Sequence, residues 1–174
     1  MENQSTPIAI ILMGVSGSGK TAVGERLSAE LGWPFFDGDD FHPPKNIQKM
    51  ARGIPLSDQD RYPWLDRLNE HIHDHLNRNI SIIIACSALK RSYRKRLSCG
   101  NRNMIFVYLK GDFDLIFSRM KNRTGHYMKE NMLRSQFVDM EEPRNAMLIY
   151  IDKDISCIVD EIIRKFYRKG ILNA

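Results

Sequence analysis

The sequence predicts an α/β fold in which a five-stranded parallel sheet is covered by helices on both faces, as a three-layer sandwich. Short apolar runs alternate with amphipathic helical segments along the 174 residues. The first apolar run leads directly into a glycine-rich loop that opens a helix. We expect one domain, residues 1–174, because this length is typical of a single domain. Ligands should collect at the carboxyl ends of the strands.

The first part of the chain supplies two strands and two helices. Residues 8–13, IAIILM, form a short Ile-rich run that is typical of a fully buried strand. Apolar residues at helical spacing follow the glycine-rich loop, and Gly32 ends that helix. Residues 34–37 predict the second strand. A turn-rich stretch comes next, with a short helix that ends near Gly53.

A long amphipathic helix is predicted over residues 63–77. Its apolar residues share one face, and these are Leu65, Leu68, Ile72 and Leu76. Pro63 suits the first turn of a helix, where its missing N–H is not needed. We therefore expect the helix to begin at this proline.

The second half of the chain continues the alternation. Strands are predicted at residues 81–89, 104–109 and 147–152. Helices are predicted at residues 90–97, 112–123, 129–140 and 155–167. Asp112 is a suitable N-cap for the second of these helices.

Composition excludes several classes of protein. The net charge is +5, from 26 Lys and Arg against 21 Asp and Glu, but the two signs are mixed along the chain and no nucleic-acid motif occurs. We expect no nucleic-acid partner. No apolar run approaches the roughly 20 residues that span a bilayer, and no export signal is recognisable, so we expect a cytoplasmic protein without membrane contact. Three cysteines without a CxxC pair predict neither a zinc site nor a disulfide framework.

Residues 14–21, GVSGSGKT, match the phosphate-binding loop pattern GxxxxGK[ST]. Glycines let the backbone turn its N–H groups toward phosphate oxygens, and the following helix adds its positive end. Lys20 should reach the terminal phosphates of ATP, and Thr21 should bind Mg²⁺. The predicted phosphate-binding residues are Gly14, Ser16, Gly17, Ser18, Gly19, Lys20 and Thr21. The chain lacks the Asn-Lys-x-Asp segment of GTPases, and its third strand is followed by Ser87 rather than by a metal-supporting Asp.

Residues 37–43, DGDDFHP, place three carboxylates and a histidine at the carboxyl end of the second strand. Such groups can hydrogen-bond several hydroxyls, and one carboxylate can take the proton of an attacking alcohol. Asp37 or Asp39 is the nearest candidate to support Mg²⁺. The sequence thus predicts a phosphate donor and an alcohol acceptor at the same edge of the sheet.

Five ordered motifs within residues 8–152 together resemble the bacterial thermoresistant type of gluconokinase. They are GVSGSGKT, FFDGDDFHPPKNIQKMARGIPLSDQDRYPWL, CSALKRSYR, LKGDFDLIFSRMKNRTGHYM and SQF followed by EEP. The resemblance implies a P-loop fold of the nucleoside-monophosphate-kinase type. It also implies ATP-dependent phosphorylation of D-gluconate to 6-phospho-D-gluconate, with Mg²⁺ and in-line transfer, commonly by a homodimer.

The resemblance also implies roles for particular residues. Asp39 is the expected base, with Asp37 and Asp40 as alternatives, and His42 the expected hydroxyl contact. The gluconate carboxylate requires cations, for which the candidates are Lys45, Lys49, Arg52, Lys90, Arg91 and Arg94. The predicted substrate-binding set is Asp37, Asp39, His42, Lys49, Lys90 and Arg94.

A helical lid is expected over residues 119–140. Arg119 and Arg123 are one helical turn apart and can both point at the transferred phosphate, so they join Lys20 and Asp39 as predicted catalytic residues. Closure of the lid would exclude water. The connection at residues 144–146 is shorter than expected for the family, in which this region approaches the adenine.

Other classes of protein also carry a phosphate-binding loop. Shikimate kinase and adenylylsulfate kinase pair the loop with an acidic second-strand segment, but their long middle segments have no match in the sequence. A nucleotide-binding regulatory module would keep the loop and lack both the acidic segment and the basic lid. The sequence therefore favours a small-molecule kinase.

Overall fold

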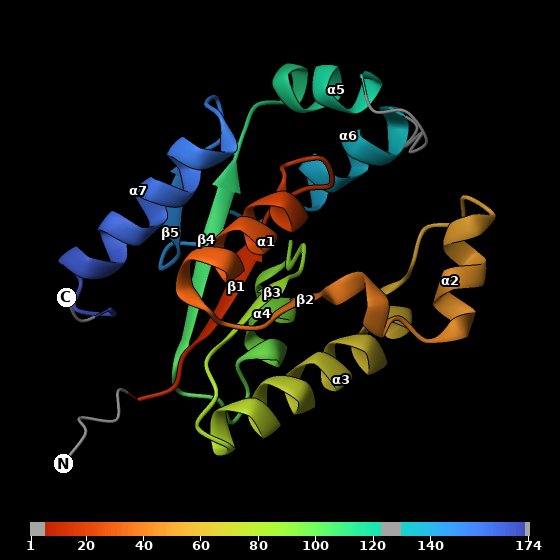
Figure 1. Ribbon diagram of the computed structural model, residues 1–174. Helices are drawn as coiled ribbons and strands as arrows, with labels where there is room; N and C mark the ends of the chain where they lie inside the picture. The colour runs from red at the N-terminus through yellow and green to blue at the C-terminus, as the bar shows by residue number, and fades with distance from the viewer. Residues whose placement is uncertain (1–5, 123–129, 173–174) are drawn as a thin grey trace, which may run out of the picture.

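The computed structural model describes residues 6–122 and 130–172, and its centre is a parallel sheet of five strands (Figure 1). The strands are β1 (Ala9–Met13), β2 (Phe35–Asp37), β3 (Ile82–Ala85), β4 (Met104–Lys110) and β5 (Met147–Tyr150). Their order across the sheet is β2-β3-β1-β4-β5, and every neighbouring pair is parallel. This confirms the predicted architecture and brings the carboxyl ends of all five strands to one edge.

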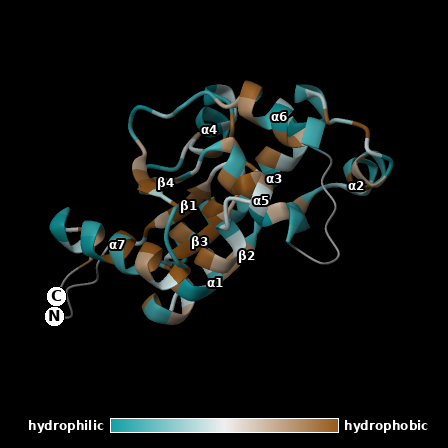
Figure 2. Ribbon diagram, turned by 90° about the horizontal axis from the view of Figure 1, so that it is seen from above, coloured by the Kyte–Doolittle hydropathy of each residue, from teal (hydrophilic) through white to brown (hydrophobic). Residues whose placement is uncertain are grey.

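Helices cover both faces of the sheet, so the molecule has three layers. On one face lie α1 (Lys20–Leu31) and α7 (Ile155–Arg168), and on the other lie α3 (Asp58–Asn77) and α4 (Arg91–Leu97). Seen from above in Figure 2, the brown apolar strands lie in the middle and the teal polar surfaces of the helices lie outside. The core therefore consists of two layers, one on each side of the sheet.

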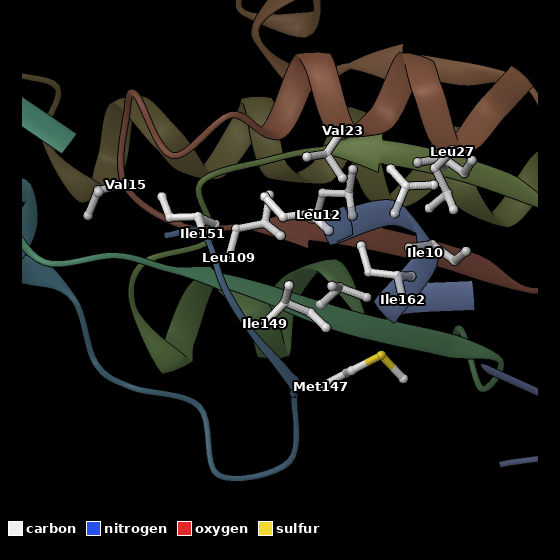
Figure 3. Packing of buried hydrophobic residues seen from close by; sticks show 14 of the residues in the cluster. Ile10, Leu12, Val15, Val23, Leu27, Leu109, Met147, Ile149, Ile151 and Ile162 are labelled. Carbon is white, nitrogen blue, oxygen red and sulfur yellow. The ribbon is translucent and has the colours of Figure 1, made fainter. Parts of the chain in front are cut away.

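The two core layers follow from the alternation of side chains along β1. Ile10 and Leu12 point to the α1 side, where they pack with Val23 and Leu27 of α1 and Ile162 of α7 (Figure 3). Ala9, Ile11 and Met13 point the other way and pack with apolar residues of α3 and α4. Because both faces are buried, β1 is apolar at every position, as the sequence predicted.

Four shorter elements surround the carboxyl edge of the sheet. They are the 3-10 helix η1 (Gly38–Phe41), α2 (Pro44–Ala51), α5 (Phe113–Lys121) and α6 (Glu130–Asp139). Figure 1 shows α5 and α6 above the upper ends of the strands and α2 projecting to one side. Asp112 caps α5 by accepting a hydrogen bond from the Leu115 N–H at 2.8 Å, which confirms the predicted N-cap.

The start of α3 was predicted wrongly. The helix begins at Asp58, five residues before Pro63, which lies inside it. Ser57 and Asp60 form a capping box, in which each side chain accepts a hydrogen bond from the other residue's backbone N–H. This cap, together with burial of Trp64 and Leu65, outweighs the backbone hydrogen bond that proline removes. The Ser-x-x-Asp pattern was the sequence signal for the true start.

Within residues 6–122 and 130–172, no helix has both the length and the apolar character that crossing a bilayer requires.

Gly24 of α1 allows the helix to lie close to β2. A Cβ at this position would be 2.2 Å from Cε2 of Phe35. Alanine normally stabilises a helix relative to glycine by up to about 1 kcal/mol, but here we expect Gly24→Ala to lower the free energy of unfolding by about 1–3 kcal/mol through overpacking. Urea unfolding measures this change, with Glu25→Ala as an exposed control on the same helix.

The Phe35→Ala background tests the cause of that loss. If the clash is responsible, adding Gly24→Ala to Phe35→Ala should cost nothing or should stabilise the protein. An equal loss in both backgrounds would show that the Gly24–Phe35 contact is not the cause.

Candidate active site

The phosphate-binding loop lies between β1 and α1 and uses glycine where the backbone requires it. Gly17 and Gly19 have φ values of 81° and 91°, in the region that side chains disfavour. Gly19 is also the N-cap of α1, and because it has no side chain the space at this helix N-terminus is open to an anion. Gly14 lies so close to β4 that a Cβ would be 2.7 Å from the Leu109 carbonyl oxygen. The local geometry is that of an anion-binding loop.

Lys20 and Thr21 connect this loop to its surroundings. The Lys20 Nζ donates to the carbonyl oxygens of Gly14 and Val15, both at 3.0 Å. The Thr21 Oγ1 donates to Asp37 Oδ2 at 2.8 Å, so the first turn of α1 is bonded to the end of β2. A cavity of about 200 Å³ lies at this junction, lined by Ser16, Gly17, Gly19, Lys20, Thr21, Asp37, Asp39, Ala85 and Cys86.

The acidic segment that follows β2 is held tightly against β3 and α3. A Cβ on Gly38 would be 2.4 Å from the Ala85 carbonyl oxygen, so glycine is required for this approach. The Trp64 indole N–H donates to the Gly38 carbonyl at 2.6 Å. The Asp39 backbone N–H donates to Asp37 Oδ1 at 3.0 Å, which caps η1. The backbone of residues 37–39 is therefore held beside the phosphate-binding loop, and both oxygens of the Asp37 carboxylate accept hydrogen bonds.

Asp39 carries a perturbed carboxyl group. The surrounding protein raises its pKa, the nearby charge of Asp37 raises it further, and Lys20 acts in the opposite direction. Its side chain is nevertheless 81% exposed, because it faces the open cavity rather than the core. A carboxylate with a raised pKa that remains accessible is suited to accept a proton from a ligand.

His42 is the one histidine beside these carboxylates in the described part of the chain. Its side chain is 4% exposed and stacks on the Trp64 ring, with the centroids 4.1 Å apart. Its Nε2 lies 3.8 Å from Asp39 Oδ1. Burial lowers the pKa of His42 to about 4, assisted by the charge of Arg61, so the ring is neutral at pH 7. His42 can therefore donate or accept a hydrogen bond but carries no charge.

The three cations predicted to bind the substrate carboxylate all have protein partners. Lys49 donates to both carboxylate oxygens of Asp60, at 2.7 and 2.8 Å, and Lys90 donates to Asp58 at 3.0 Å. Arg94 donates to three carbonyl oxygens, those of Ala88, Leu89 and Glu141. These partners join α2, α3 and α4 to one another and to the strand ends.

Two residues of this region were missed in the sequence. Arg61 lies on α3, donates to the Tyr93 hydroxyl at 2.8 Å and is close enough to His42 to lower its pKa. Asn46 is 1% exposed, and its Nδ2 atom lies 3.3 Å from His42 Nδ1. Arg61 was missed because the helix was expected to begin only at residue 63. For Asn46, the available signal was its position four residues after His42.

The lid segment borders the loop on its other side. Gln136 of α6 accepts a hydrogen bond from the Ser16 N–H at 2.7 Å. Arg119 and Met120 of α5 line a cavity of about 630 Å³ beside Gly17–Gly19 of the loop and residues 153–156. Arg123, the other predicted lid arginine, lies outside the described residues.

The short connection at residues 144–146 does not approach the phosphate-binding loop. It lines a separate cavity of about 560 Å³ with Arg91, Lys95 and Phe106. The segment that does border the loop is residues 153–156, between β5 and α7. The shortened connection at residues 144–146 lines neither of the two cavities that border the loop, so it offers no candidate contact to a nucleotide base.

Comparisons with known proteins agree with this geometry. The shikimate kinase family model matches residues 16–169. The thermoresistant gluconokinase of Escherichia coli (strain K12) is 46% identical over 162 residues, which cover 89% of this chain and 93% of that protein. The thermosensitive gluconokinase of the same strain is 45% identical over 157 residues, covering 88% and 84%.

Solved structures give the same result. A gluconokinase from Sinorhizobium meliloti 1021 superposes with a TM-score of 0.85 at 40% identity, covering 94% of this chain and 93% of the other. Shikimate kinase from Aquifex aeolicus has a TM-score of 0.63 at 15% identity, over 95% and 100% of the two chains, and this likeness shows a shared fold alone. The chain therefore belongs to the gluconokinase family, within the broader group of kinases that the shikimate kinase model describes.

Proposed function

We propose that this protein transfers the terminal phosphoryl group of ATP to the 6-hydroxyl of D-gluconate, giving 6-phospho-D-gluconate and ADP. One observation carries the proposal most directly. The hydrogen bond between Thr21 and Asp37 places a phosphate-binding loop and an acidic, histidine-containing segment at a single junction. The loop suits a nucleotide, and the acidic segment suits a polyol, so one cavity contacts both reactants.

The donor half consists of the loop and the first turn of α1. Backbone N–H groups of Ser16, Gly17 and Gly19 would cradle the phosphates, with Ser18 and Gly14 shaping the turn. Lys20 is already at the loop and would move its ammonium from carbonyl oxygens to the terminal phosphate. The cavity beside Arg119 and residues 153–156 is the proposed site for the nucleotide base.

The oxygens of Thr21 and Asp37 suit Mg²⁺, which prefers hydroxyl, carboxylate and phosphate ligands. They lie 2.8 Å apart, at the loop, where a hydroxyl and a carboxylate can be shared with a nucleotide phosphate. When bound, the ion would neutralise charge on the phosphates. Asp37 takes the place of the carboxylate that is absent after β3, where the chain has Ser87.

Asp39 is the proposed base. Its carboxylate would accept the proton of the 6-hydroxyl as the oxygen bonds to the terminal phosphorus in line with the breaking bond to ADP. The raised pKa makes Asp39 a stronger base than an ordinary aspartate. Asp37 is committed to Thr21 and to the Asp39 backbone, which leaves Asp39 the better placed of the two.

Residues that would bind gluconate and a lid that would close over it complete the proposed site. His42 and Asp37 would contact hydroxyls, and the carboxylate would bind to the cationic group of Lys49, Lys90 and Arg94. Arg61 joins this group as a candidate, because its charge is close enough to His42 to lower the pKa of that ring. Residues 119–140 would close as a lid over the loop. The Ser16 N–H, which donates to Gln136 in this structure, would then turn to the phosphates. We propose a single-domain cytoplasmic homodimer without a nucleic-acid partner.

A coupled assay of ADP release tests the proposed substrate. The panel compares D-gluconate, shikimate, adenylylsulfate and AMP as acceptors, each with ATP and Mg²⁺. We expect clear turnover with gluconate and background rates with the others, since the acidic segment matches a chain of hydroxyls. Equal rates with and without gluconate would refute the kinase assignment.

Asp39→Asn removes the proposed base while keeping the shape of the side chain. We expect kcat to fall about 10²- to 10⁴-fold with little change in ATP affinity. In the unmodified enzyme, activity requires the ionised carboxylate, so it should fall as the pH drops through the raised pKa of Asp39. Asp40→Asn, on the exposed side of the same turn, is the matched control. Equal effects of the two substitutions would remove Asp39 from its role.

Lys20→Met removes the ammonium group and keeps the aliphatic stem. We expect transfer to fall by about 10²-fold or more, because one preorganised charge on the transferred group is lost. The fold should persist, since Lys20 belongs to neither of the two core layers. Circular dichroism and ADP release measure the two properties, and full activity in the variant would contradict the assigned role of the loop.

A further inference from the structure

Asn46 of α2 is a buried amide between the candidate active site and α3. Its Nδ2 donates to the Asp60 carbonyl oxygen at 2.8 Å and lies 3.3 Å from His42 Nδ1. The opposite orientation of the amide would place its oxygen against the Asp60 carbonyl, where two acceptors would repel. The Asp60 contact therefore fixes which atom of Asn46 faces His42.

This orientation determines the hydrogen position on His42. An amide NH₂ group has hydrogens to donate and no acceptor, so His42 Nδ1 must be the unprotonated, accepting nitrogen. A neutral imidazole carries one proton, which must then be on Nε2. The Nε2 atom is the one that faces Asp39, at 3.8 Å from Oδ1.

We propose that Asn46 is a positioning residue that holds His42 in its neutral Nε2–H form, so that His42 donates a hydrogen bond to the hydroxyl whose proton Asp39 accepts. This inference rests on the proposed function for the identity of the hydroxyl, but the state of His42 does not depend on it. A donor on one residue and an acceptor on its neighbour complement a single hydroxyl group. The pair would set the direction in which the acceptor oxygen faces the phosphate.

The surroundings of His42 support this state. Trp64 covers one face of the ring, and the charged groups near it are Asp39 of η1 and Arg61 of α3. Arg61 disfavours a second positive charge, and burial acts in the same direction. Asp39 points its carboxylate at the open cavity, so it does not force protonation of the ring.

Nuclear magnetic resonance of the whole protein with ¹⁵N-labelled histidine tests the proposed state without any substrate. At pH 7 we expect the His42 ring to show a proton on Nε2 and none on Nδ1. His75 is an internal control, because its Nδ1 lies 2.9 Å from the His71 carbonyl oxygen, which only accepts, so His75 should carry the Nδ1 proton. His42→Gln identifies the signal. A proton on Nδ1 of His42 would overturn the proposal.

A kinetic comparison tests the positioning role. Asn46→Asp places a carboxylate against Nδ1, which should draw a proton there and lower kcat about 10-fold or more, with KM for ATP unchanged. Asn69→Asp is the matched control, because Asn69 of α3 is partly buried and also donates its amide to carbonyl oxygens, those of Leu97 and Cys99, away from the site. We expect it to lower stability while kcat and the His42 spectrum stay unchanged.

The two measurements separate the possible failures. If gluconate is not the acceptor, the spectrum of His42 still reports whether Asn46 sets its state. If the spectrum is as expected but Asn46→Asp retains the kcat of the Asn69→Asp control, the positioning role is wrong. If Asn46→Asp does not fold, Asn46→Ser is used instead, and the shift of its His42 Nδ1 signal is measured. An unchanged signal in Asn46→Ser would contradict the inference.

Discussion

The site depends on one constraint, which is that β1 and β2 are not neighbours in the sheet. β3 lies between them, so the phosphate-binding loop and the acidic segment can meet only across its carboxyl end. Small residues at this point make the meeting possible. Ala85 and Cys86 line the shared cavity, Gly38 packs on the Ala85 carbonyl, and the Gly14 N–H donates to the Ser87 carbonyl at 3.3 Å. A large side chain here would separate the two halves that Thr21 and Asp37 join.

The helix α3 holds the acidic segment, residues 37–43, and its neighbours in place. Its first two turns reach three separate elements: Trp64 bonds to η1, Asp60 bonds to Lys49 of α2, and Asp58 bonds to Lys90 at the start of α4. The capping box at Ser57 therefore does more than start α3. It also fixes the first residues of this helix, to which the segment of residues 37–43 is bonded.

Sequence reasoning predicted the sheet, the order of elements and the two halves of the site, because each rests on local pattern. Apolar strands such as β1 and the loop at residues 14–21 have signatures within a few residues. Partners that lie far along the chain could not be predicted in this way. Lys49 is bonded to Asp60 and Arg94 to the Glu141 carbonyl, 11 and 47 residues away, and their role in substrate binding stays a prediction. No local pattern shows which cations are already bonded to protein.

Asp39 and His42 are neighbours, and one physical effect shifts their pKa values in opposite directions. The surrounding protein disfavours charge, so it raises the pKa of Asp39, whose side chain still faces the open cavity, and lowers that of the buried His42. The first change makes a better proton acceptor, and the second leaves a neutral donor. A charged imidazole beside Asp39 would form an ion pair and lower the basicity of the carboxylate. A neutral His42 therefore leaves the pKa of Asp39 raised, as the proposed role of base requires. Lys20, whose charge acts against this shift, would move toward phosphate in the proposed complex.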